Sequence, residues 1–64
     1  MENNIRGRRL ELGLSQDQLA EKSGTARTII SQLENGTRTV ITSETMLKIA
    51  KALDSSVADI FLFN

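Results

Sequence analysis

The chain of 64 residues contains no cysteine, histidine, proline, tryptophan or tyrosine. Without cysteine it can form neither a disulfide bond nor a thiolate metal site. Without histidine it lacks the commonest general base and metal ligand of proteins. The sequence also offers no paired carboxylates and no glycine-rich phosphate loop to take over these roles. We therefore expect no enzymatic activity, no cofactor and no bound metal.

Long hydrophobic runs, linkers and repeats are also missing. The sequence has no stretch of 18 apolar residues, which predicts that no segment spans a membrane. Residues 1–4 are polar and do not resemble a signal peptide, so we expect a cytoplasmic protein. Without a linker, residues 1–64 are expected to form one domain, with no separate dimerisation or peptidase domain after Asn64. A chain this short has a thin core and is expected to gain stability from well-packed helices and from dimerisation.

The charges balance, with eight Lys and Arg against eight Asp and Glu and a net charge of 0. Domains that bind nucleic acid usually carry a basic excess, so the total alone argues against such a ligand. Six of the eight basic residues nevertheless lie in the first 38 positions, beside five acidic ones. A positive surface must therefore come from their placement on one face, and we expect modest non-specific affinity for DNA.

Hydrophobic periodicity and capping signals predict two short helices in the first 24 residues. Gly13 is suited to end the first helix in a left-handed conformation. Ser15 and Gln18 form a capping box that opens the second helix, and Gly24 closes it. The positions expected on the inward sides of these two helices are Ile5, Arg9, Leu12, Leu19, Ala20 and Ser23.

A third helix is expected to begin at Arg27 and to end at Asn35 and Gly36. Its cap position falls on Ala26, a poor capping residue, so Thr25 is expected to serve in its place. Residues 37–42 are mostly β-branched and lack helical periodicity, which indicates an extended loop.

Two further helices are expected after this loop. Thr42 or Ser43 caps the fourth helix, and Ser56 with Asp59 forms an acidic capping box at the start of the fifth. The fourth helix is expected to supply Met46, Leu47, Ile49, Ala50 and Leu53 to the core, and the fifth carries Val57, Ile60 and Phe61. Five helices with no obligatory strand predict an all-α fold.

The predicted third helix has two different faces. On a helical wheel its polar and apolar residues centre on opposite sides. The polar set is Arg27, Thr28, Ser31, Gln32 and Asn35, and the apolar set is Ile29, Ile30 and Leu33. Apolar anchors beneath such a helix hold it rigidly, and its polar face is then free to enter a groove.

Residues 14–36 read as two short helices joined by a tight glycine turn. Gly24 adopts a positive φ at little cost, and the small Ala20 lets the two helices cross closely. This is the helix-turn-helix arrangement, whose second helix lies in the major groove of DNA while the first crosses the backbone. Gln16, at the start of the first helix of the pair, is then expected to face a phosphate.

The chemistry of the side chains assigns roles on the polar face. Gln32 can form two hydrogen bonds with adenine, Arg27 can pair with guanine or a phosphate, and Thr28 can touch a thymine methyl or donate to a phosphate. Residues just past the helix are better placed for the DNA backbone. The expected base-reading residues are Arg27, Thr28 and Gln32, and the expected backbone contacts are Gln16, Ser31, Asn35 and Arg38. The plain alternative is a solvated polar face, which any small helical bundle has.

Four segments of the sequence together resemble the Cro/C1-type (XRE-like) helix-turn-helix domains, particularly the small repressor and Cro domains of lambdoid phages. These segments are RRLELGLSQ at residues 8–16, QLAEKSGT at 18–25, QLENG at 32–36 and LKIAKAL at 47–53. The resemblance covers nearly the whole chain and implies a compact five-helix, lambda-repressor-like DNA-binding domain with the helix-turn-helix in helices two and three.

The resemblance also implies roles for individual residues. The family's groove-reading positions fall on Arg27, Thr28 and Gln32, and its phosphate-binding position at the start of helix two falls on Gln16. Arg9 and Glu34 fall on two positions that the family joins in a largely buried ion pair, a structural role.

The sequence departs from the family pattern in the loop after Gly36 and at Asp54. The loop is about one residue longer than is usual and has Val40 and Ile41 where proline is often found. Residues 39–42 include no basic residue, although many members of the family have basic residues in this loop. Asp54 stands where glycine is common, which is tolerable because aspartate visits the left-handed region.

A homodimer on a palindromic DNA operator is the expected assembly, because one subunit reads only a few base pairs and repressors generally bind two half-sites. The apolar end of the chain is unusual for a free terminus. The residues expected at the dimer interface are Val40, Ile41, Val57, Phe61, Leu62 and Phe63. For Ile60 and Phe61 the alternative is that they complete the core.

The sequence thus predicts a sequence-specific transcriptional regulator, a repressor or Cro-like protein. Two alternatives share the same domain. One is a restriction-modification controller protein, and the other is an antitoxin whose partner is a toxin protein. The sequence does not separate them.

Overall fold

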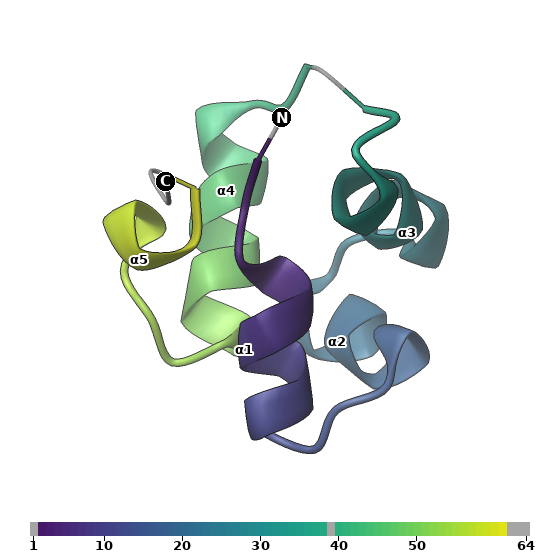
Figure 1. The fold of residues 1–64 in the computed structure, drawn as a ribbon, viewed down its shortest axis with the longest axis vertical. Coiled ribbons are helices and arrows are strands. Elements are labelled where there is room, and N and C mark those ends of the chain that lie inside the picture. Colours follow the sequence, from purple (N-terminus) through teal and green to yellow (C-terminus); the bar gives the residue numbers. More distant parts are fainter. Residues whose placement is uncertain (1, 39, 62–64) are drawn as a thin grey trace.

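The computed structural model describes residues 2–38 and 40–61 of the chain. These residues form five helices and no strand, as predicted (Figure 1). The helices are α1 (Ile5–Glu11), α2 (Gln16–Ser23), α3 (Arg27–Asn35), α4 (Ser43–Ala52) and α5 (Val57–Phe61). None of the helices in the described part of the chain is long and apolar enough to cross a membrane.

The predicted capping signals mark the ends of the helices. In the capping box of α2, the amide of Gln18 donates to the Ser15 hydroxyl at 3.0 Å, and the Ser15 amide donates to Gln18 Oε1 at 2.8 Å. Thr42 accepts from the Thr45 amide at the start of α4. The box before α5 also forms, because the Asp59 amide donates to Ser56 Oγ at 3.1 Å. These side chains satisfy amides that the first turn of a helix leaves unpaired.

A single core of aliphatic side chains joins the five helices. Its fully buried members are Ile5, Leu19, Ile30, Leu33, Ile49, Leu53 and Ile60. Helix α2 packs against α3 and α4, and α1 packs against α3 and α5. The segment before α1 adds two hydrogen bonds, from Asn3 Nδ2 to the Leu33 carbonyl and from the Asn4 amide to the Ile60 carbonyl. The end of α3 is therefore fixed both by its apolar side chains and by the start of the chain.

The prediction that Leu47 belongs to the core is wrong. Its side chain is 51% exposed, whereas Ile49, Ala50 and Leu53 are buried and Met46 packs against the core. Leu47 lies two positions before Ile49, a rotation of about 200° around the helix, so both cannot face inward.

The predicted cap at Thr25 is also wrong. Ala26 occupies the cap position of α3, with an extended backbone at φ −60° and ψ 139°. The Thr25 amide closes the turn after α2 by donating to the Ala20 carbonyl at 3.1 Å. This turn buries the Thr25 side chain, and its hydroxyl has no hydrogen-bond partner among the residues that the structure describes.

We expect Thr25→Val to raise the free energy of unfolding by about 1 kcal/mol, because valine has the same shape and carries no buried hydroxyl to desolvate. Urea unfolding measures the change. Thr25→Ser is the matched control, because it keeps the hydroxyl and loses a methyl group, and it should destabilise the protein. A midpoint for Thr25→Val at or below that of the unchanged protein would mean that the hydroxyl has a partner in solution.

Candidate nucleic-acid interface

The turn between α2 and α3 sets the angle at which the two helices meet. Gly24 ends α2 with φ 68°, a left-handed conformation that glycine adopts without a steric penalty. Ala20 packs against the core beneath this turn, and its carbonyl accepts from the Thr25 amide. Only residues 24–26 separate the helices, so α2 and α3 form one compact helix-turn-helix unit.

The nine residues of α3 divide between the core and the surface. Ile30 and Leu33 are buried, and Ile29 packs against the core at the edge. Arg27, Thr28 and Asn35 are exposed, and Ser31 and Gln32 are half-buried. The structure thus keeps the whole predicted polar face out of the core, on a helix anchored from below.

Arg27, at the start of α3, forms an ion pair with Asp17 of α2. Arg27 Nε lies 3.3 Å from Asp17 Oδ1, and both side chains are mostly exposed. Exposed pairs of this kind contribute little to stability, because water and salt screen them. The guanidinium of Arg27 can therefore leave Asp17 for a base or a phosphate at small cost.

Arg9 and Glu34 form a buried, two-pronged ion pair that joins α1 to the end of α3. Arg9 Nε donates to Glu34 Oε2 at 2.8 Å, and Arg9 Nη2 donates to Oε1 at 3.0 Å. The two side chains are only 10% and 4% exposed. The hydrogen bond to Glu34 raises the pKa of Arg9 above its ordinary value, against the opposing effect of burial. The arginine on the inner side of α1 is therefore paired and charged.

Gln16 extends this network to the start of α2. Its Nε2 donates to Glu34 Oε1 at 3.3 Å, and Arg9 Nη1 donates to the Leu14 carbonyl at 2.8 Å. The sequence predicts a phosphate contact for Gln16 but not this bond to Glu34. Since a primary amide carries two N–H donors, one remains for a phosphate. Glu34 therefore ties the side chain of Gln16 to the end of α3.

Arg38 folds back onto the end of α3, a contact that was not predicted from the sequence. Gly36 ends the helix with φ 76°, and the amides of Thr37 and Arg38 both donate to the Gln32 carbonyl. This reversal brings Arg38 Nε to 3.2 Å from Gln32 Oε1. The signal in the sequence is Gly36, because a left-handed residue after a helix turns the chain back along it.

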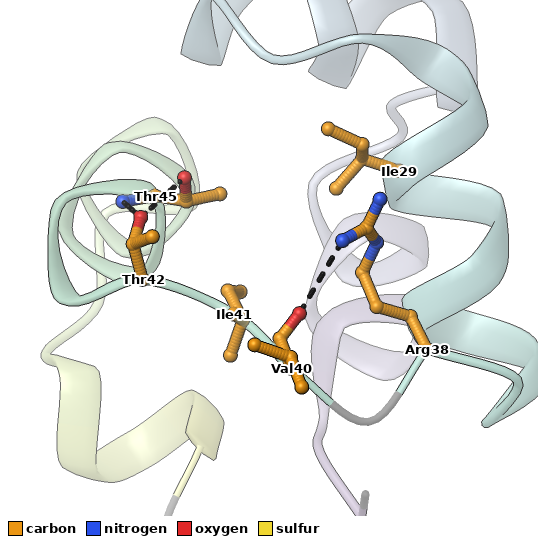
Figure 2. Close-up of a pocket in the computed structure, with 6 residues that line it drawn as sticks. All are labelled: Ile29, Arg38, Val40, Ile41, Thr42 and Thr45. Atoms are coloured by element: carbon orange, nitrogen blue, oxygen red, sulfur yellow. Dashed lines mark hydrogen bonds between the residues drawn. The ribbon is translucent and has the colours of Figure 1, made fainter.

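The predicted interface residues lie on separate elements. Val40 is 74% exposed and Ile41 half-buried in the loop before α4. Together with Ile29, Arg38, Thr42 and Thr45, they line a hollow of about 230 Å³ (Figure 2). Val57 is half-buried on α5, and Phe61 is buried in the core, as the alternative for that residue predicted. Leu62 and Phe63 lie outside the described residues.

The sequence and the fold match known proteins. The model of a helix-turn-helix family matches residues 5–60 of the chain. The control protein C.SmaI of Serratia marcescens is 48% identical over 54 residues, which make up 84% of this chain and 63% of that protein. The chain therefore spans slightly less than two thirds of this relative's length.

Two solved structures have similar folds. The restriction-modification controller protein C.AhdI from Aeromonas hydrophila has a TM-score of 0.81 and 38% identity, covering 88% of this chain and 83% of its own. The complex of SinR with SinI contains a chain with a TM-score of 0.82 and 34% identity, covering 86% of this chain and 53% of that one. The family model matches most of the chain, and the geometry of α2 and α3 agrees with it. The chain therefore belongs to the helix-turn-helix family of Cro/C1-type DNA-binding domains.

Proposed function

We propose that this protein is a transcriptional regulator of the restriction-modification controller type, which binds a palindromic operator as a homodimer. The observation that carries the proposal is the division of α3 into a buried apolar side and an outward polar side, beside the tight turn at Gly24. A helix held in this way can lie in the major groove without rearranging. The likeness to C.SmaI and C.AhdI, both described as controller or control proteins, supports this type of regulator.

In this proposal, some polar side chains of α3 read bases, and other side chains on α3, on α2 and just after α3 contact the DNA backbone. Arg27, Thr28 and Gln32 read base edges. The backbone contacts are Gln16, Ser31, Asn35 and Arg38. Phosphate contacts position a protein on DNA, whereas contacts to base edges select the sequence. Because the net charge is 0, few phosphates are neutralised per subunit, and the protein relies on its base contacts more than on general attraction.

The proposed homodimer places two copies of α3 in successive major grooves. Half-sites in such complexes lie about 34 Å apart, one turn of the duplex. Val40 and Ile41 beside the hollow are the first candidate contact, and Val57 with Leu62 and Phe63 is the second. Acting on DNA, the protein would work in the cytoplasm.

A second candidate function is a domain whose main partner is another protein, such as a toxin. SinR, whose fold is similar, is known in a complex with the protein SinI. A protein partner would also cover an apolar surface such as the one around Val40.

Selection of binding sites from a random duplex pool, near 0.15 M salt where non-specific binding is weak, tests the proposal. We expect an enriched inverted repeat with its halves about one helical turn apart. A well-folded protein that enriches no sequence would overturn the proposed operator binding and favour the protein-binding module.

We expect Gln32→Ala to lose discrimination at one base position of the selected site, at a cost of about 1–3 kcal/mol. Competition binding with duplexes changed at each position measures this loss. Asn35→Ala is the matched control on the same helix, because a backbone contact should weaken all sequences alike. If Gln32→Ala also weakens all sequences equally, Gln32 contacts the backbone and does not read a base.

A further inference from the structure

Gln32, the central base-reading residue of the proposed function, has its amide oxygen already engaged. Arg38 Nε donates to Gln32 Oε1 at 3.2 Å. A guanidinium carries only donors, so the atom of Gln32 that meets it must be the oxygen and not the nitrogen. The bond therefore fixes which way round the amide of Gln32 stands, and its two N–H groups remain for another partner.

Arg38 is itself held in place, which makes this orientation durable. Its backbone amide donates to the Gln32 carbonyl at 3.3 Å, and its Nη1 donates to the Val40 carbonyl at 3.4 Å. Figure 2 shows its guanidinium between Ile29 and Val40, at the edge of the hollow. Arg38 is half-buried there, unlike an arginine that extends freely into water. These contacts hold Arg38 beside Gln32 in the chain without DNA.

This arrangement changes the base that Gln32 suits best. Pairing with adenine requires the amide oxygen to accept from N6 while the amide nitrogen donates to N7. The oxygen has a second lone pair, but with Arg38 Nε on the first, the N6 donor of adenine would have to bind beside a positive charge. Guanine presents two acceptors, O6 and N7, and both suit N–H donors beside a cation.

We propose that Arg38 is a positioning residue for base recognition, which holds Gln32 Oε1 so that Gln32 donates to guanine rather than pairing with adenine. The inference rests on the proposed function, since it needs α3 in the major groove. It replaces the adenine pairing that side-chain type alone suggests for Gln32. Arg38 is then more than a phosphate contact, because its loss alters which base is preferred.

The test uses the selected operator and four duplexes that differ at the base pair identified by Gln32→Ala. We expect the unchanged protein to prefer guanine over adenine there by about 5- to 150-fold. Arg38→Lys retains the positive charge but has a methylene where arginine has Nε. We expect this variant to lose the guanine preference while the dependence of affinity on salt stays the same.

Two further measurements separate positioning from other roles. In a Gln32→Ala background, Arg38→Lys should leave base preference unchanged, because Arg38 acts through Gln32. Circular dichroism confirms that each variant is folded. A preference for adenine in the unchanged protein, or a guanine preference that survives Arg38→Lys, would overturn the inference while leaving DNA binding intact. No enriched sequence at all would instead overturn the proposed function and the inference with it.

Discussion

Replacing Glu34 with alanine is expected to lower the free energy of unfolding by about 3–5 kcal/mol. The substitution leaves the guanidinium of Arg9 buried without its charged partner, and Gln16 Nε2 loses an acceptor as well. A domain of 64 residues has a total stability of only about 3–10 kcal/mol. The variant therefore lies close to the limit of folding, and thermal unfolding should show a midpoint lower by more than about 12 °C.

An exposed ion pair provides the matched control for this experiment. Glu44 and Lys48 are four residues apart on α4, with 3.5 Å between Lys48 Nζ and Glu44 Oε1, and Glu44 is mostly exposed. Glu44→Ala should cost no more than about 0.5 kcal/mol. The double variant Arg9→Met/Glu34→Leu removes both buried charges and should recover much of the lost stability. Equal midpoints for Glu34→Ala and Glu44→Ala would show that the buried pair does not stabilise the fold.

The second large effect is expected at Val40, where Val40→Asp should convert the proposed dimer into a monomer. Val40 is 74% exposed in the single chain, so an aspartate there is solvated and the fold is unaffected. In a dimer contact the same carboxylate would be buried without a partner. Light scattering measures the mass, and operator affinity should fall by about 10²–10⁴-fold because the two half-sites are no longer bound together.

Leu10→Asp is the control for this prediction. Leu10 is 58% exposed near the end of α1, and Figure 1 shows that end and the loop before α4 at opposite ends of the molecule. The Leu10→Asp variant should keep the mass and the operator affinity of the unchanged protein. If Val40→Asp remains dimeric while Leu62→Asp/Phe63→Asp is monomeric, the interface lies at the C-terminal end.

Local signals explain why the helices could be predicted from the sequence. The capping boxes at Ser15 and Ser56 act between residues three apart, and the left-handed φ of 51° at Asp54 is a property of one residue. Such interactions involve only residues close together in the sequence, so a short sequence segment is enough to predict them. The same holds for the two faces of α3, because a helical wheel needs only the sequence of the helix itself.

Contacts between distant segments explain what could not be predicted. Arg8 Nε donates to the Leu53 carbonyl and to Ser55 Oγ, which are 45 or more positions away in the sequence. No local sequence pattern predicts either bond. The Arg38–Gln32 bond depends on how far the chain reverses after Gly36. The error at Leu47 has another origin. Leu47 is predicted in the core because it is hydrophobic, although its angle around the helix places it outside the inward stripe.

The separation of roles within α3 has a consequence for how the domain can diverge. The proposed base-reading residues Arg27, Thr28 and Gln32 are outside the core, and substitutions at such surface positions usually change stability by less than about 0.5 kcal/mol. New DNA preferences can therefore arise by single mutations that leave the fold intact. Arg9 and Glu34 differ, because either one alone is costly to change. The domain is free to acquire new operators step by step, while its buried ion pair can be exchanged only as a unit.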